Sequence, residues 1–259
     1  MTSFAQALKD RNWVVTAELD PPRGVDLGPL LDLAGRITGR VDALVLSDHQ
    51  GANLRQSPWW AAHRLAETTP AEVILTLTCR DRNRLALAGD ILAAAAAGVD
   101  NLLLVSGDFL SLGDHPQAKP VYDLDSVQAL MLADGLRQGH DLNGQALSGA
   151  PELCLGAVLA PEARPLAPQA IKMRKKRAAG AEFFITRALS GPDALKTFLQ
   201  EVGEPGAPLI AGVEAKDQAG VATATELAQA IKASGQARGL HLSAGDPEAL
   251  AALVDACGR

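Results

Sequence analysis

The sequence predicts an eight-stranded (β/α)8 barrel, an α/β fold also called a TIM barrel, on the basis of three observations. Short runs rich in branched apolar residues occur eight times, and segments with helical spacing lie between them. The length of 259 residues matches the roughly 250 that eight strand–helix units need. We expect one barrel domain over residues 1–259. The predicted strands cover residues 12–18, 42–47, 72–78, 101–106, 152–159, 182–186, 208–214 and 238–243.

Most of these runs lack strict polar alternation, which is typical of parallel strands buried on both faces. Between them, apolar residues recur at helical intervals, for example from Leu85 through Ile91 to Ala95. An open sheet of Rossmann type is the alternative fold. It is disfavoured because the first run leads into Asp20–Gly24 (DPPRG) and not into a glycine-rich turn that opens a helix.

Composition excludes several classes of protein. The chain is 47% hydrophobic and 21% charged, and its net charge of -6 gives no general attraction to nucleic acid or to an anionic membrane. Residues 1–10 lack the apolar run of a secretion signal, and no uncharged stretch reaches the ~18 residues of a membrane span. Cys79, Cys154 and Cys257 form neither a disulfide framework nor a zinc motif. We expect a cytoplasmic protein.

Polar residues lie where several predicted strands end, and in a (β/α)8 barrel the carboxyl ends of the strands form the working face. They are Glu18, Ser47, Asp48, Thr76, Thr78 and Asp108. The long irregular stretch 108–123 follows the fourth strand, and loops of that length are usually functional. Residues 138–151 precede the fifth strand, so we expect them to form a surface connection at the opposite end.

Two carboxylates are the main catalytic candidates. Glu18 lies between apolar neighbours, a setting that can desolvate a carboxyl and let it serve as a general acid; the alternative is an ion pair, for example with Arg23. Asp108 follows Gly107, which would let a ligand approach the backbone; the alternative is a helix cap or a turn former.

Residues 172–177 (KMRKKR) carry five positive charges. Such a run forms either a solvated helix face or a cluster that neutralises a diphosphate. The five histidines show no pairing that indicates a metal site, and we assign none of them as a ligand.

Five pieces, in this order, resemble the methylenetetrahydrofolate reductase family along nearly the whole chain, in a short bacterial form. They are Thr16–Gly24 (TAELDPPRG), Leu77–Asn83 (LTCRDRN), Leu104–Asp108 (LVSGD), Gly113–Pro116 (GDHP) and Arg177–Ala181 (RAAGA). The resemblance implies a flavoprotein of one-carbon metabolism, a barrel oxidoreductase that carries FAD. Such enzymes reduce 5,10-methylenetetrahydrofolate to 5-methyltetrahydrofolate, usually with NADH or NADPH as donor.

The resemblance also implies roles for single residues. Glu18 matches the acid that protonates the folate and opens its five-membered ring, and Asp108 matches an aspartate beside the flavin and the pterin. Arg187 joins these two as a residue that binds the substrate. The residues implied to bind FAD are Ser47, Thr76, Ser106, Asp108, Arg174, Lys175 and Lys176.

The chain departs from the family pattern at three positions. Thr76 replaces a histidine that touches the flavin, Ala160 a tyrosine that packs on it, and Arg187 a glutamine that hydrogen-bonds the pterin. The connection between residues 214 and 239 is also short, which predicts an open mouth. We expect a homo-oligomer, or a complex in which another subunit covers the mouth or donates electrons. Two alternatives to the flavoenzyme follow: a flavin-independent folate reductase, and a folate-binding subunit without activity of its own.

Overall fold

The eight strands form a closed barrel in which each is parallel to the next along the chain and β8 pairs with β1. The computed structural model describes residues 3–259. The strands are β1 (Val14–Leu19), β2 (Ala43–Leu46), β3 (Glu72–Thr78), β4 (Asn101–Val105), β5 (Cys154–Leu159), β6 (Phe183–Ala188), β7 (Leu209–Ala215) and β8 (Gly239–Ala244). The predicted (β/α)8 fold is therefore confirmed, with every strand boundary within two residues of its expected position.

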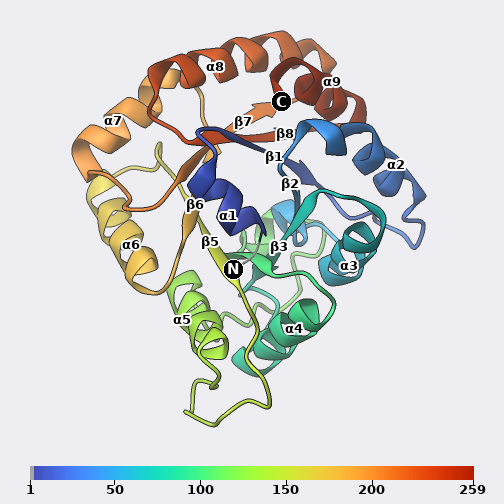
Figure 1. Cartoon of the computed structure of the whole chain (residues 1–259), viewed down its shortest axis with the longest axis vertical. Coiled ribbons are helices and arrows are strands. Elements are labelled where there is room, and N and C mark those ends of the chain that lie inside the picture. The colour runs from blue at the N-terminus through green and yellow to red at the C-terminus, as the bar shows by residue number, and fades with distance from the viewer. Residues whose placement is uncertain (1–2) are drawn as a thin grey trace.

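One helix follows each strand and packs on the outside of the barrel (Figure 1). These helices are α2 (Gly28–Ile37), α3 (Pro58–Thr68), α4 (Arg84–Ala96), α5 (Ser126–Arg137), α6 (Leu166–Ala178), α7 (Pro192–Val202), α8 (Val221–Ser234) and α9 (Pro247–Cys257). Side chains define several of the starts. Asn83 accepts a hydrogen bond from the backbone of α4, and Asp125 forms a capping box with Gln128 at α5.

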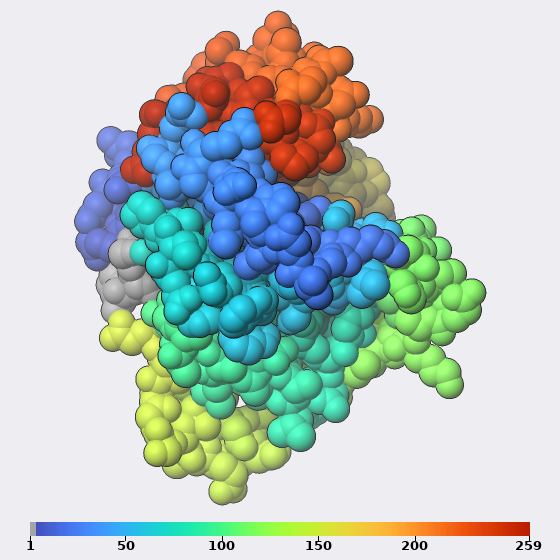
Figure 2. All heavy atoms as spheres, turned by 90° about the vertical axis from the view of Figure 1, so that its right-hand side faces the viewer, coloured from blue at the N-terminus to red at the C-terminus, as the bar shows by residue number. Residues whose placement is uncertain are grey.

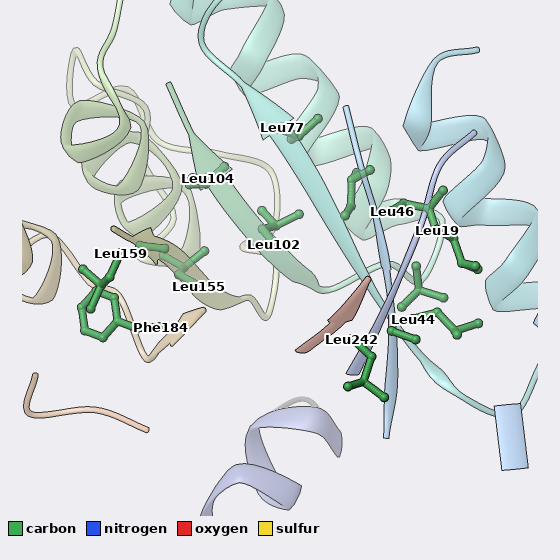
Figure 3. Close-up of a cluster of buried hydrophobic side chains, with 14 of the residues drawn as sticks. Leu19, Leu44, Leu46, Leu77, Leu102, Leu104, Leu155, Leu159, Phe184 and Leu242 are labelled. Carbon is green, nitrogen blue, oxygen red and sulfur yellow. The ribbon is translucent and has the colours of Figure 1, made fainter. Parts of the chain in front are cut away.

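The apolar core has two layers because successive residues of a strand point to opposite faces. In β1, Val15, Ala17 and Leu19 face the helices, and Val14 packs inside the barrel. Figure 3 shows outward-facing leucines of several strands, including Leu19 and Leu242. Complete burial of one such side chain contributes about 1.5–3 kcal/mol. The same alternation turns Thr16 and Glu18 of β1 toward the barrel interior.

A helix at the start of the chain, α1 (Ser3–Asp10), closes the amino-terminal end of the barrel (Figure 1). Phe4 is fully buried in the inner core, and its ring meets that of Phe183 edge to face with centroids 5.3 Å apart. Because α1 blocks this end, only the carboxyl ends of the strands remain open to ligands.

The two long loops lie at opposite ends of the barrel. Residues 108–123 follow β4 and include a short 3-10 helix, η3 (Leu110–Leu112). The Asp114 carboxylate of this loop pairs with Arg23 of the β1–α2 loop and accepts a hydrogen bond from the Leu54 backbone. In Figure 2 these blue and green loops lie at the right, away from α1. The yellow-green segment before β5 lies at the lower left of the same view, on the side of α1.

Within residues 3–259, none of the helices is long and apolar enough to cross a membrane.

Candidate functional site

A cavity of about 590 Å³ opens at the carboxyl ends of the strands, and all eight strand ends contribute to its wall. This volume lies within the range of about 300–1,000 Å³ that ligand sites occupy. The resemblance assigns nine residues to catalysis, FAD or substrate, and seven of them line this cavity. They are Glu18, Ser47, Thr76, Ser106, Asp108, Lys176 and Arg187. Ala160 also lies on the wall.

Glu18 is the end of a hydrogen-bonded chain of three side chains. Its Oε2 lies 3.3 Å from Nε2 of His241, and Nδ1 of His241 lies 3.0 Å from Oγ1 of Thr16. The Thr16 hydroxyl also donates to the carbonyl oxygen of Leu240 at 3.4 Å. An imidazole that bridges a hydroxyl and a carboxylate in this way can relay a proton to or from Glu18. Arg23, the alternative partner, pairs with Asp114.

Asp108 faces the cavity from a backbone that its neighbours hold in place. Gly107 has φ 90°, and a Cβ there would lie 2.9 Å from Cβ of Arg80, so only glycine suits the turn. The carbonyl oxygen of Asp108 accepts from the Tyr122 hydroxyl at 3.2 Å and from Arg80 at 3.4 Å. Arg187 lies 3.9 Å from its carboxylate, beyond hydrogen-bond range. Among residues 3–259 the carboxylate has no hydrogen-bond donor, so it is free to meet a ligand.

The Leu77–Asn83 motif forms a framework for the mouth. Arg80 is almost fully buried, and its guanidinium binds the Asp81 carboxylate and reaches the carbonyl oxygens of His49 and Asp108. Arg82 binds the buried carboxylate of Asp48 at 2.6 Å.

Asp48 in turn accepts from the backbone N–H of Thr78 at 2.8 Å. Arg82 also binds Asp90 on α4 at 2.6 Å. The motif thus joins the loops after β2, β3 and β4 and places the residues that surround the cavity.

Hydroxyl groups line the part of the cavity near β2, β3 and β4. Ser47 donates a hydrogen bond to Asp20. Burial raises the pKa of the Asp20 carboxyl and this hydrogen bond lowers it, and the net effect is a raised pKa. Within the described chain, Thr76 and Ser106 make no side-chain hydrogen bond to protein, so both hydroxyls are available to a ligand.

The basic run on α6 presents only two of its five cations to the cavity. Gln169, Lys172 and Lys176 line the cavity at intervals of three and four residues, which place them on one face of the helix. Nζ of Lys176 donates to the carbonyl oxygen of Val158 at 2.6 Å, and burial, with Lys172 nearby, lowers its pKa to about 8. Arg174 and Lys175 are exposed and do not line the cavity.

The sequence did not identify His241 and Glu214 as residues of the site. The spacing of the histidines indicates no metal site, and His241 meets a carboxylate from a strand more than 200 residues away in the chain. Strand alternation puts His241 on the same face as Ser243, and Glu214 on the same face as Gly212. That signal is present in the sequence, but it does not say which face is the interior.

Fold and site together define a (β/α)8-barrel protein with ionisable side chains gathered at the carboxyl ends of its strands. A family model described as "Methylenetetrahydrofolate reductase" matches residues 3–215. The chain therefore belongs to the methylenetetrahydrofolate reductase family. No curated protein sequence matches it.

Solved structures support the fold. An uncharacterized protein from Clostridium thermocellum that binds two copies of 5-methyl-5,6,7,8-tetrahydrofolic acid is similar with a TM-score of 0.67 and 16% identity, over 96% of each chain. A 3-hexulose-6-phosphate synthase is similar with a TM-score of 0.56 and 18% identity, over 94% of this chain and 99% of the other. A 2,3-dimethylmalate lyase has a TM-score of 0.57 and 14% identity, over 93% and 79%. At these identities the likeness concerns the fold.

Proposed function

We propose that the protein reduces 5,10-methylenetetrahydrofolate to 5-methyltetrahydrofolate by hydride transfer, with Glu18 as the general acid. The observation that carries this proposal is the chain from Glu18 through His241 to Thr16 on the cavity wall, because it places a carboxyl group and an imidazole beside a ligand-sized space. Membership of a family named for this reaction supports the choice of substrate.

The reaction needs one proton and one hydride. Glu18 gives its proton to N10 of the substrate, the bond between N10 and the methylene carbon breaks, and an iminium cation forms at N5. Hydride then adds to the methylene carbon and gives the methyl group. His241 holds the proton on Glu18 before transfer, and the Asp108 carboxylate stabilises the cation electrostatically.

The donor groups of the cavity fit FAD as the cofactor. Lys172 and Lys176 form a cationic face suited to a diphosphate, and the hydroxyls of Thr76 and Ser106 are free to bind the polar edge of a ring. Together with Ser47 and Asp108, these residues would hold FAD. When bound, FAD would supply hydride that it had received from NADH or NADPH.

The visible absorption spectrum of the purified protein tests this proposal, combined with an assay of methylenetetrahydrofolate reduction. We expect a yellow protein whose flavin absorption is bleached by NADH or NADPH and restored by 5,10-methylenetetrahydrofolate. A protein that leaves 5,10-methylenetetrahydrofolate unreduced in the presence of FAD and NADH or NADPH would contradict the proposal.

A flavin-free folate protein is the second candidate. Thr76 and Ala160 carry neither the ring nor the side-chain length expected of residues that contact a flavin, and the neighbour from Clostridium thermocellum binds two folate molecules. The same spectrum separates the candidates. A colourless protein that oxidises NADH with the folate is a flavin-independent reductase. A colourless protein that only binds the folate is a binding subunit.

A further inference from the structure

Glu214 is a cavity carboxylate that the proposed reaction does not use. In β7, Ile210 belongs to the inner core, and Gly212 and Glu214 follow on the same face and line the cavity. The side chain of Glu214 is exposed, and it makes no hydrogen bond or ion pair with any residue in the described part of the chain. Both of its oxygens are therefore free to accept hydrogen bonds from a ligand.

Arg187, on the neighbouring strand β6, supplies donors beside these acceptors. The two strands approach closely here, because a Cβ on Gly212 would lie 2.9 Å from the carbonyl carbon of Arg187. Arg187 lines the cavity, and most of its side chain is exposed. It lies 3.9 Å from Asp108, so this weak, solvated contact leaves the guanidinium free to change partner. A carboxylate offers only acceptors and a guanidinium only donors. The wall formed by β6 and β7 therefore presents acceptors next to donors.

A pterin ring has the complementary edge. Its 2-amino group and the adjacent ring N–H both donate, and the carbonyl oxygen beside them accepts. We propose that Glu214 accepts from the two donors and so selects the pterin, beside Arg187, whose position the family resemblance already assigns to the substrate and whose guanidinium can donate to the carbonyl oxygen. The inference rests on the proposed folate function and deepens it by naming the residues that determine specificity.

The position of Glu214 relative to Glu18 suits this arrangement. Glu214 pairs in register with Ser243 of β8, and β8 in turn pairs with β1, which carries Glu18. Glu214 and Glu18 are thus separated by two strand spacings, or about 10 Å around the barrel. Both side chains point into the same cavity, so an edge held by Glu214 leaves the opposite ring of the pterin on the side of the cavity where Glu18 lies.

The same wall disfavours a flavin. The pyrimidine edge of a flavin presents a single N–H between two carbonyl oxygens, so a carboxylate against it faces at least one acceptor. Acceptors that face each other make no hydrogen bond, and their charges repel. We therefore place the pterin against β6 and β7, and leave the hydroxyl-lined wall near β3 and β4 to the cofactor.

Calorimetric titration of the full chain with 5-methyltetrahydrofolate and with its analogue lacking the 2-amino group tests the pair. Glu214→Ala removes the acceptors, Glu214→Gln retains one, and Glu204→Ala removes a carboxylate at the opposite end of β7 as a matched control. We expect the natural protein to bind 5-methyltetrahydrofolate about tenfold more tightly than the analogue. We expect Glu214→Ala to lose that difference, Glu214→Gln to keep part of it, and Glu204→Ala to keep it all.

Two results would overturn the inference, and they are distinguishable. If the natural protein binds 5-methyltetrahydrofolate and both Glu214 variants bind it equally well, Glu214 is a solvated rim residue and the proposed function stands. If the natural protein binds neither compound, the proposed function fails and the inference fails with it. Thermal unfolding curves of the variants should match that of the natural protein, because the Glu214 side chain is exposed and unpaired.

Discussion

Glu18 and His241 meet across the junction where the barrel closes, with 3.3 Å between Oε2 and Nε2. Glu18 belongs to the first strand and His241 to the last, and the strands pair in parallel with Thr16 beside His241. Both side chains are largely withdrawn from water, with 21% and 8% of the glutamate and histidine side chains exposed. Closure of the barrel is thus what brings this carboxyl group and this imidazole together.

Glu18→Gln should abolish reduction of 5,10-methylenetetrahydrofolate while folate binding persists. The amide keeps the shape and the hydrogen-bonding capacity of the side chain but cannot release a proton. Loss of a general acid lowers the rate by roughly 10²–10⁴-fold. Formation of 5-methyltetrahydrofolate measures the effect, and Glu226→Gln on the exposed face of α8 is a matched control. Full activity of the Glu18 variant would remove this residue from the mechanism.

His241→Phe should lower kcat by up to about tenfold with little change in KM, since it removes one hydrogen bond behind the acid. A phenyl ring retains the bulk of the imidazole but cannot share the proton of Glu18. The pH dependence of kcat should change as well, and a purely structural role would leave that profile unaltered. Thr16→Val should have a smaller effect of the same kind, because it removes only the acceptor that orients His241.

Binding of FAD should weaken as pH rises through about 8. Burial lowers the pKa of Lys176 to about 8 from its usual value of 10.5, so its charge is lost above that pH and attraction to a diphosphate decreases. Lys176→Met should bind FAD less tightly at pH 7 and show a flatter pH dependence. Lys175→Met, on the exposed face of the same helix, should behave like the natural protein. Fluorescence titrations of each protein with FAD, at pH values from 6.5 to 9.5 that span the pKa of Lys176, measure these affinities.

The lowered pKa of Lys176 also makes the free energy of unfolding depend on pH. Between about 8 and 10.5 the unfolded chain binds more protons at Lys176 than the folded chain. The contribution of this lysine to the free energy of unfolding therefore increases with pH across that window. In Lys176→Met this contribution should disappear, and urea unfolding of the two proteins at pH 7 and pH 10 measures it.

Arg82→Met should destabilise the protein by about 3–5 kcal/mol, because it leaves the buried Asp48 carboxylate without its cation. Arg84→Met removes an exposed pair with Asp123, and its effect on the free energy of unfolding should be much smaller, because solvent screens exposed pairs. The two arginines are two residues apart in one segment, so each serves as a control for the other. Equal free energies of unfolding from urea titration would contradict the assignment of Arg82 to the framework of the mouth.

Much of the fold could be predicted because its determinants are local. A run such as 72–78 has the composition of a strand buried on both faces, and its eightfold recurrence with intervening helices matches a barrel of this length. Strand ends also located Glu18, Ser47, Thr76 and Asp108, since the carboxyl ends of parallel strands share one rim.

Helix phase is less easily predicted. Of Arg174, Lys175 and Lys176, which the resemblance assigns to FAD, only Lys176 lines the cavity, together with Lys172 of the same run. Which face of a helix points inward depends on its rotation against the barrel. A run of consecutive cations contains no apolar spacing from which to read that rotation.

The sequence by itself determined the alternation of strands and helices, the barrel and the two carboxylates that its strand ends carry. Only the tertiary structure decided which side chains meet: His241 behind Glu18, Arg187 between Asp108 and the strand of Glu214, and Lys176 withdrawn toward Val158. The physical reason is the separation along the chain between the residues that interact. Strand periodicity depends on neighbours two residues apart, whereas these contacts join residues that come together only when eight strands close into a ring and helices rotate onto it.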